Sequence, residues 1–206
     1  MTPVLTIESL SKAYGAKNVL CGLNLEILPG EIYGLFGSNG SGKSTLLRIA
    51  AGALRKTSGS VRLGGATGYV AQKFSLYPDL TVEENVVFFA KCYEADAAEA
   101  RARAAAVLDR VGLASFRQEP AGQLSHGWRQ RLSLAAALTH SPSLLLLDEA
   151  TAGLDPAARA TLWEVLSDYA RAGGAILLAT HFTDEGERCS RTACLEDGRL
   201  TAMVFG

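Results

Sequence analysis

Eight consecutive residues, GSNGSGKS at positions 37–44, have the types and spacing of a loop that binds phosphate. They fit the pattern G-x-x-x-x-G-K-[ST] and stand between a short apolar run, IYGLF, and a segment with helical periodicity, STLLRIAAG. Glycines allow successive backbone N–H groups to turn toward one anion, and the following helix adds the positive end of its dipole. The alternative is a glycine-rich turn with a surface lysine, which the order strand, loop, helix disfavours.

The side chains of this loop predict a nucleotide site. Lys43 is expected to reach the β- and γ-phosphates, Ser44 to offer its hydroxyl to Mg²⁺, and Thr45 to add a phosphate contact. The expected ATP-binding residues of the loop are Gly37, Ser38, Asn39, Gly40, Ser41, Gly42, Lys43, Ser44 and Thr45.

A second stretch, LLLLDEA at positions 144–150, complements the loop. Four leucines predict a buried strand, and Asp148 and Glu149 emerge at its carboxyl end, where open parallel sheets bind ligands. We expect Asp148 to hold magnesium through its hydration shell and Glu149 to polarise or position the attacking water. The alternative is a pair of solvated carboxylates that end a strand.

Two further polar residues follow predicted strands. His181 comes directly after AILLAT and is expected to contact the γ-phosphate, although a lone histidine at a strand end is usually structural. Gln72 follows GYVA and can offer its amide oxygen to magnesium or water, although taken alone it would be a surface glutamine.

The elements that must position these residues change character along the chain. Strand patterns occupy both ends, at residues 4–10, 18–31, 32–36, 143–150 and 175–180. Between them stand helix patterns, with capping boxes at Thr81/Glu84 and Asp96/Glu99 and a further helix start at Ser125–Gly127. The order predicts a helical subdomain inserted in an α/β core.

Composition limits the classes of protein that remain. The 206 residues are 48% hydrophobic and 20% charged with a formal net charge of −1, so we expect one globular domain and no nucleic-acid partner. No signal peptide and no apolar run of about 18 residues is apparent, which favours a cytoplasmic location. Cys21, Cys92, Cys189 and Cys194 show no zinc spacing and are expected to be buried thiols in a reducing compartment.

Six motifs in order resemble the nucleotide-binding subunit of an ABC transporter. They are the loop 37–44, Gln72, LSHGWRQRL (124–132), LLLLDEA, AGLD (152–155) and His181, and together they span nearly the whole chain. Two longer stretches, QKFSLYPDLTVEEN and THFTDEGERC, together with GWRQRL, resemble bacterial export-type subunits that move drugs, lipids or polysaccharides.

The resemblance implies an α/β fold. Its parts would be a P-loop NTPase core with a mostly parallel sheet, an N-terminal antiparallel β subdomain and an inserted α-helical subdomain. Residues 1–206 would form one domain, with 1–72 and 141–206 as the core and 73–140 as the helical subdomain carrying the signature motif.

The resemblance also assigns roles. Tyr14 would stack on adenine, Gln72 would sense magnesium and touch the membrane subunit, and Asp155 would cross a dimer interface. Lys43, Glu149 and His181 would be catalytic, with Glu149 as the catalytic glutamate and His181 as the switch histidine. The signature residues Ser125, His126 and Gly127 would act on ATP bound to the partner chain.

The implied assembly is a homodimer that closes head to tail on two ATP molecules and drives a separate transmembrane permease. The protein would lie on the inner face of the cell membrane, held there by the permease. The permease would dock near four apolar residues, about half of which could instead be core: Phe74, Leu76, Tyr77 and Leu80.

Some positions depart from the usual family pattern. His126 and Trp128 replace a glycine and a glutamine of the signature, and Thr151 and Ala71 stand where proline is frequent. Position 126 needs its N–H more than an absent side chain, so histidine is compatible with the motif if its backbone angles suit. The sequence stops at Gly206, soon after the predicted closing hairpin, so no C-terminal regulatory extension is expected.

Two other functions fit part of the pattern. A soluble relative acting in DNA repair or on ribosomes is one, but repair types carry a long coiled coil and ribosomal types fuse two such domains. A regulatory nucleotide binder without turnover is the other, and only the altered signature favours it, since Lys43, Asp148, Glu149 and His181 are all present.

Overall fold

The structure, a computed structural model, describes residues 2–93 and 96–204. The chain forms two compact units. The first holds the residues up to Tyr69, Ser143–Glu149 and the residues from Tyr169 onward, and the second holds Val70–Pro142 and Ala150–Asp168. The boundaries expected from the sequence, 73 and 140, stay a prediction.

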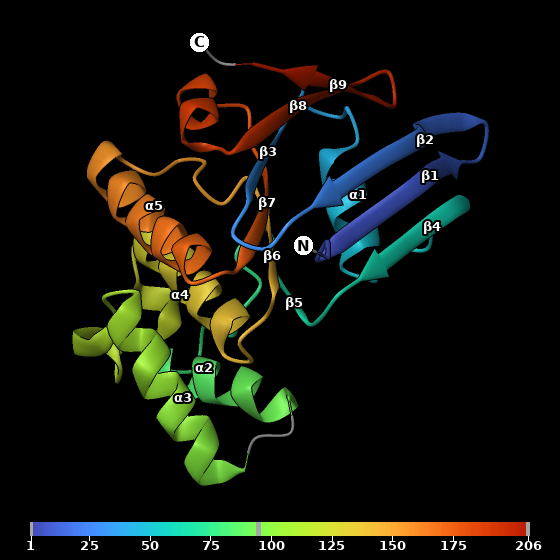
Figure 1. The fold of residues 1–206 in the computed structure, drawn as a ribbon. Helices are drawn as coiled ribbons and strands as arrows, with labels where there is room; N and C mark the ends of the chain where they lie inside the picture. The colour runs from blue at the N-terminus through green and yellow to red at the C-terminus, as the bar shows by residue number, and fades with distance from the viewer. Residues whose placement is uncertain (1, 94–95, 205–206) are drawn as a thin grey trace. The chain divides into compact units, whose positions relative to one another are not determined.

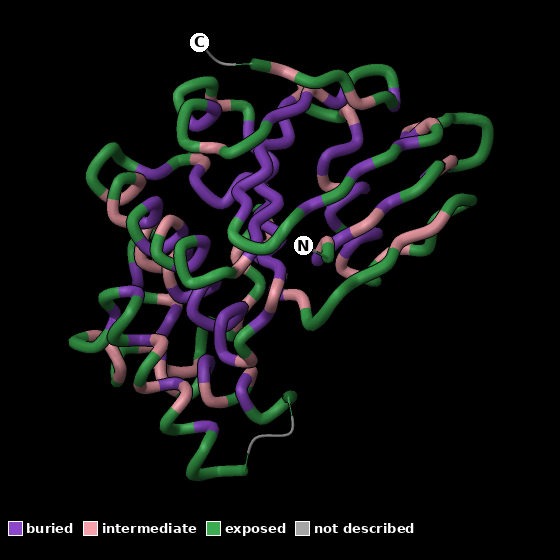
Figure 2. Tube along the Cα trace, in the orientation of Figure 1, coloured by how far each residue is buried: buried purple, intermediate pink, exposed green. Residues whose placement is uncertain are grey.

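A six-stranded sheet is the centre of the first unit (Figure 1). β3 pairs in parallel with β7 and β8, β6 pairs in parallel with β7, and β9 closes the edge antiparallel to β8. The order across the sheet is β5 (Thr67–Val70), β6 (Leu144–Asp148), β7 (Ala175–Ala179), β3 (Ile32–Phe36), β8 (Arg191–Glu196) and β9 (Arg199–Met203). Every residue of β3, β6 and β7 is buried, as their continuous apolar sequences predict (Figure 2).

A second, antiparallel sheet of three strands completes the first unit. Its order is β2 (Lys17–Ile27), β1 (Leu5–Tyr14) and β4 (Ser58–Leu63). Alternate apolar residues of β1 and β2 enter one core with α1 (Lys43–Ala50) and the central strands of the larger sheet. The mostly parallel sheet and the N-terminal antiparallel sheet predicted from the sequence are both confirmed.

The second unit is helical in its described part. Its elements are α2 (Val82–Cys92), α3 (Ala97–Arg110), α4 (His126–Leu138), the α5 helix (Pro156–Arg171) as far as Asp168, and short 3-10 turns η1 (Ala114–Phe116) and η2 (Ala121–Gln123). The capping box of Thr81 and Glu84 is present as predicted. Asp96 caps α3 through the N–H groups of Ala98 and Glu99, while the Glu99 carboxylate pairs with Arg103. Of the second predicted capping box, the structure therefore shows the Asp96 cap, while the Glu99 side chain pairs with a residue one turn further along α3.

The four cysteines are free, but the expectation that all are buried is wrong. Cys92 is exposed at the end of α2, and Cys21, Cys189 and Cys194 are half-buried. Among the described residues, none of the helices is both long and apolar enough to span a bilayer.

One buried amide fixes the segment that leads into α2. Asn85 has no exposed surface, and its Oδ1 accepts the N–H of Tyr77 at 2.9 Å. Its Nδ2 donates to the carbonyl oxygens of Tyr77 at 2.9 Å, Thr81 at 3.0 Å and Leu80 at 3.3 Å. A single side chain therefore bonds four backbone groups of a segment that has no strand or helix of its own before α2.

Replacing Asn85 by alanine should destabilise the protein. The Tyr77 N–H loses its acceptor, three carbonyl oxygens each lose one of two donors, and the buried amide leaves a gap, so we expect a loss of about 2 kcal/mol. Urea unfolding of Asn85→Ala measures it. The control is Gln118→Ala, because Gln118 is an exposed amide whose hydrogen bond to Glu83 spans 3.0 Å; its loss should stay below about 0.5 kcal/mol. Equal losses would show that burial of the Asn85 network contributes nothing.

Candidate functional site

The phosphate loop connects β3 to α1 and is shaped by two glycines. Gly37 has φ 146°, and a Cβ there would lie 2.5 Å from the carbonyl oxygen of Leu195. Gly42, with φ 112°, is the N-cap of α1. A side chain at either position would force the backbone out of its turn, so the loop depends on both glycines.

The Lys43 side chain is buried and bonds the backbone of its own loop. It is 4% exposed, and its Nζ donates to the carbonyl oxygens of Gly37 at 2.8 Å and Ser38 at 3.1 Å. The Oγ of Ser41 is buried and has no hydrogen-bond partner among the described residues. A cationic group and an unsatisfied hydroxyl in one backbone cradle fit an oxyanion such as phosphate.

Asp148, at the end of β6, is held by two hydroxyl groups. It is 1% exposed; Oδ1 accepts from Ser44 Oγ at 2.8 Å, and Oδ2 accepts from the Tyr69 hydroxyl at 3.0 Å. Burial raises the pKa of Tyr69 above its ordinary value, so the phenol stays protonated and remains a donor. Tyr69 lies in β5, and nothing in the sequence pattern singled it out, because its role depends on which strand neighbours β6.

Glu149 has an unusual backbone. Its φ is 52°, in the left-handed region that residues other than glycine rarely adopt, and its N–H donates to the carbonyl of Ala179 at 3.0 Å. Such a conformation costs about 1–3 kcal/mol and persists where the surroundings hold it. The strain turns this carboxylate out of the line of β6 at the carboxyl edge of the sheet.

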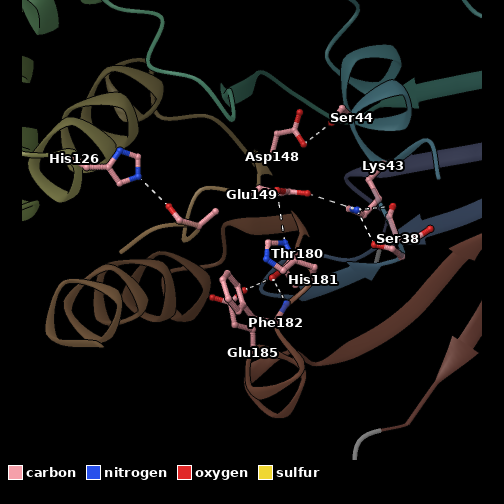
Figure 3. Close-up of polar contacts among 12 residues, drawn as sticks. Ser38, Lys43, Ser44, His126, Asp148, Glu149, Thr180, His181, Phe182 and Glu185 are labelled. Carbon is pink, nitrogen blue, oxygen red and sulfur yellow. Dashed lines mark hydrogen bonds and ion pairs between the residues drawn. The ribbon is translucent and has the colours of Figure 1, made fainter. Parts of the chain in front are cut away.

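The turned carboxylate lies between two groups that the sequence also predicted (Figure 3). Glu149 Oε1 is 3.6 Å from Lys43 Nζ, and Oε2 is 3.7 Å from His181 Nδ1. Both distances exceed a hydrogen bond and describe electrostatic contacts. A carboxylate beside a phosphate-binding lysine and a half-exposed histidine can accept a proton from water that attacks a phosphoryl group.

A pocket of about 470 Å³ opens beside the phosphate loop. It is lined by Ser38–Ser41, by Lys17–Val19 and Cys21 of the β2 region, and by the hairpin turn Glu196–Gly198. Tyr14, predicted to stack on adenine, lies at the end of β1 with 49% of its surface exposed. Lys12 Nζ stands 4.7 Å from the centre of its ring.

The remaining predicted residues belong to the second unit and are described within it. Ser125 is the exposed N-cap of α4, and its side chain makes no capping hydrogen bond within the described chain. His126 Nε2 lies 2.9 Å from the carbonyl oxygen of Ala152 (Figure 3), and Asp155 caps α5 by accepting the N–H of Ala158 at 2.9 Å. Gln72 is exposed.

Trp128 packs inside the helical unit. Its ring lies 4.6 Å from that of Phe116, and the Arg131 guanidinium stands 4.4 Å from its centre. The sequence contained no signal for the His126–Ala152 contact, because the two residues are 26 positions apart.

Comparison with known proteins identifies the family. Residues 20–152 match the family model described as ABC transporter. The chain belongs to the ABC transporter family.

Individual relatives agree with this assignment. The chain is 39% identical to the Nod factor export ATP-binding protein I of Paraburkholderia xenovorans, over 96% of this chain and 69% of that protein. It is 34% identical to the linearmycin resistance ATP-binding protein LnrL of Bacillus subtilis, over 97% and 68%. The chain thus spans about two thirds of the length of these relatives.

Solved structures support the same fold. A dimeric post-hydrolysis state of an ATP-binding cassette bound to ADP and Pi has a TM-score of 0.88 and 28% identity, with 97% of each chain covered. The cbiO1 protein of Clostridium perfringens, part of an ABC transporter complex, has a TM-score of 0.88 and 29% identity, over 98% of this chain and 88% of that one.

This ABC protein is therefore an ATP-binding transporter subunit and an ATPase. Its relatives are transport proteins, which does not favour the DNA-repair or ribosomal alternative.

Proposed function

We propose that ATP is hydrolysed at the carboxyl edge of the larger sheet, with Lys43 on its phosphates, Glu149 as general base and His181 as the neighbour of the γ-phosphate. One observation carries this proposal: the Glu149 carboxylate is turned by a left-handed backbone to within 3.6 Å of Lys43 and 3.7 Å of His181. Gly37–Thr45 would cradle the phosphates, and Tyr14 would stack on adenine.

Mg²⁺ is proposed as the cofactor, and the residues present fit it. Ser44 and Asp148 bring a hydroxyl and a carboxylate oxygen within 2.8 Å of each other, and oxygen is the ligand that magnesium prefers. Within the described part of the chain, no cluster of three or more metal-binding side chains is found. This agrees with a cation held by one or two protein oxygens and by substrate phosphates. Gln72 is a further proposed ligand, and the cation would neutralise phosphate charge during transfer.

The second unit is proposed to complete a partner chain's site in a homodimer. The uncommitted Ser125 hydroxyl and the N–H groups of His126 and Gly127 begin α4, where a helix dipole favours an anion. Asp155 would lie at the dimer interface. We keep residues 73–140 as the proposed helical subdomain.

A separate transmembrane permease is the proposed partner, which would place this chain on the cytoplasmic face of the membrane. The proposed docking residues precede α2: Tyr77 is 48% exposed, and Phe74, Leu76 and Leu80 are half-buried. The Tyr77 ring lies 5.1 Å from that of Phe88, which is also exposed. The names of the relatives, one for export and one for drug resistance, support export of a drug, lipid or polysaccharide.

Glu149→Gln should greatly slow turnover and leave ATP binding intact. Loss of the general base lowers kcat by about 10²- to 10³-fold, and bound ATP then keeps two chains together. ATPase assays and light scattering with ATP and magnesium measure the two effects. Glu8→Gln removes an exposed carboxylate of the same unit, paired with Arg62, and should leave both unchanged. If the Glu149→Gln protein stays monomeric at saturating ATP, the proposed dimer is wrong.

Tyr69→Phe should weaken the response to magnesium. Asp148 loses the donor that orients Oδ2, so the magnesium concentration at half-maximal ATPase rate should rise about 3- to 10-fold. A magnesium titration at saturating ATP measures this value. Tyr33→Phe, a change at a buried tyrosine of β3, is the control and should leave the titration unchanged. Identical titrations for all three proteins would exclude a role for Tyr69.

Tyr77→Asp should release the protein from membranes. A buried charge at a docking surface is costly, so the variant should move to the soluble fraction, while the parent sediments with a membrane-spanning chain. Fractionation of the tagged protein in its own host measures this. Tyr93→Asp is the control, because Tyr93 is 46% exposed in the same unit and stacks on His140. Recovery of the parent only with ribosomes or DNA would favour the soluble alternative.

A further inference from the structure

The segment that carries His181 is held by two buried residues to which the proposed reaction gives no role. Thr180, directly after β7, has no exposed surface, and Glu185, in the 3-10 helix η3 (Thr183–Arg188), is 1% exposed. The Thr180 hydroxyl donates to Glu185 Oε2 over 2.5 Å, a length typical of a hydroxyl bound to a carboxylate (Figure 3). Because an unpaired buried carboxyl group is costly, this bond stabilises the position of Glu185.

The same hydroxyl group also accepts a hydrogen bond from the residue that follows His181. Thr180 Oγ1 accepts the N–H of Phe182 at 3.1 Å, so the residues on either side of the histidine are joined by one oxygen atom. The Phe182 ring in turn lies against the His181 ring, with 4.2 Å between the ring centres and a tilt of 34°. The backbone turn and the ring contact together restrict the directions in which the imidazole can point.

The segment from Thr180 to Glu185 is held by a hydrogen bond at each end. The N–H of Thr180 donates to the carbonyl of Leu35 in β3 at 3.0 Å, next to the phosphate loop. Directly after η3, Cys189 Sγ donates to the carbonyl oxygen of Glu185 at 3.2 Å. Burial, followed by the nearby Glu185, raises the pKa of Cys189 to about 12, so the thiol stays protonated and keeps its donor.

We propose that Thr180 and Glu185 are positioning residues that hold the His181 imidazole against Glu149. Glu185 orients the Thr180 hydroxyl, the hydroxyl fixes the Phe182 backbone, and the Phe182 ring and the turn orient His181. This inference rests on the proposed role of His181 in turnover. A histidine on a free loop would sample many orientations, and a displacement of about 1 Å can cost about 10²-fold in rate.

The test compares Thr180→Val, which removes the hydroxyl group at constant shape, with Thr180→Ser, which keeps it. We expect kcat for ATP hydrolysis to fall by about 10-fold or more in Thr180→Val and by less than about 3-fold in Thr180→Ser. KM and the equilibrium affinity for ATP should stay within about 2-fold of the parent, because the phosphate loop is untouched. Glu185→Gln still accepts the hydroxyl but without charge, and its kcat should lie between the two.

Two controls separate positioning from general damage. Thr139 is 2% exposed, and its hydroxyl donates to the carbonyl of Ala136 at 2.9 Å, far from His181 in sequence and in the other unit. Thr139→Val should therefore lose stability in thermal unfolding without losing kcat. In a double-mutant cycle, Thr180→Val should have no further effect on kcat once His181 is alanine, because the residue it positions is gone.

The outcomes distinguish this inference from the function on which it rests. If His181→Ala keeps the parent kcat, the proposed role of His181 is wrong. If His181→Ala is slow but folded Thr180→Val and Glu185→Gln proteins turn over at the parent rate, Thr180 and Glu185 do not position it. If Thr180→Val lowers kcat equally with and without His181, the residue acts through the general fold and the proposal is overturned.

Discussion

The parallel pairing of β3, β7 and β6 brings the carboxyl ends of three neighbouring strands to one edge, and the position of the phosphate loop, the acidic residues and His181 depends on it. The loop before α1 follows β3, the two acidic residues end β6, and His181 follows β7. Backbone hydrogen bonds tie these ends together, from Glu149 to Ala179 and from Thr180 to Leu35. These bonds hold the backbone of Glu149 and Thr180 to the neighbouring strands.

The charged side chains at this edge of the sheet are stabilised by protein hydrogen bonds and ion pairs instead of by water. Lys43 is almost fully buried, yet two loop carbonyls and the Glu149 carboxylate surround its ammonium group. Asp148 is equally buried and accepts two hydroxyl hydrogen bonds. Because these groups are desolvated, their electrostatic effect on a phosphate is larger than it would be at the surface.

Local chemistry explains which features could be predicted from the sequence. The phosphate loop, the buried strands and the cap at Thr81 depend on neighbouring residues, and the structure has them where the pattern indicated. Tyr69 and the contact of His126 with Ala152 depend on which segments meet in three dimensions, which no spacing reports. The cysteines were misjudged because residue type predicts average burial, whereas Cys92 stands on the exposed side of a helix end. The site roles themselves stay predictions.

The left-handed backbone of Glu149 carries a conformational cost that a glycine at this position would not have. Glycine adopts that conformation without the steric penalty, so replacing Glu149 by glycine relieves strain at the same moment that it removes the carboxylate. The same change removes the carboxylate beside the buried Lys43 ammonium, so relieved strain and lost charge pairing act in opposite directions. The stability of a glycine variant would therefore report the balance between backbone strain and charge pairing at this one position.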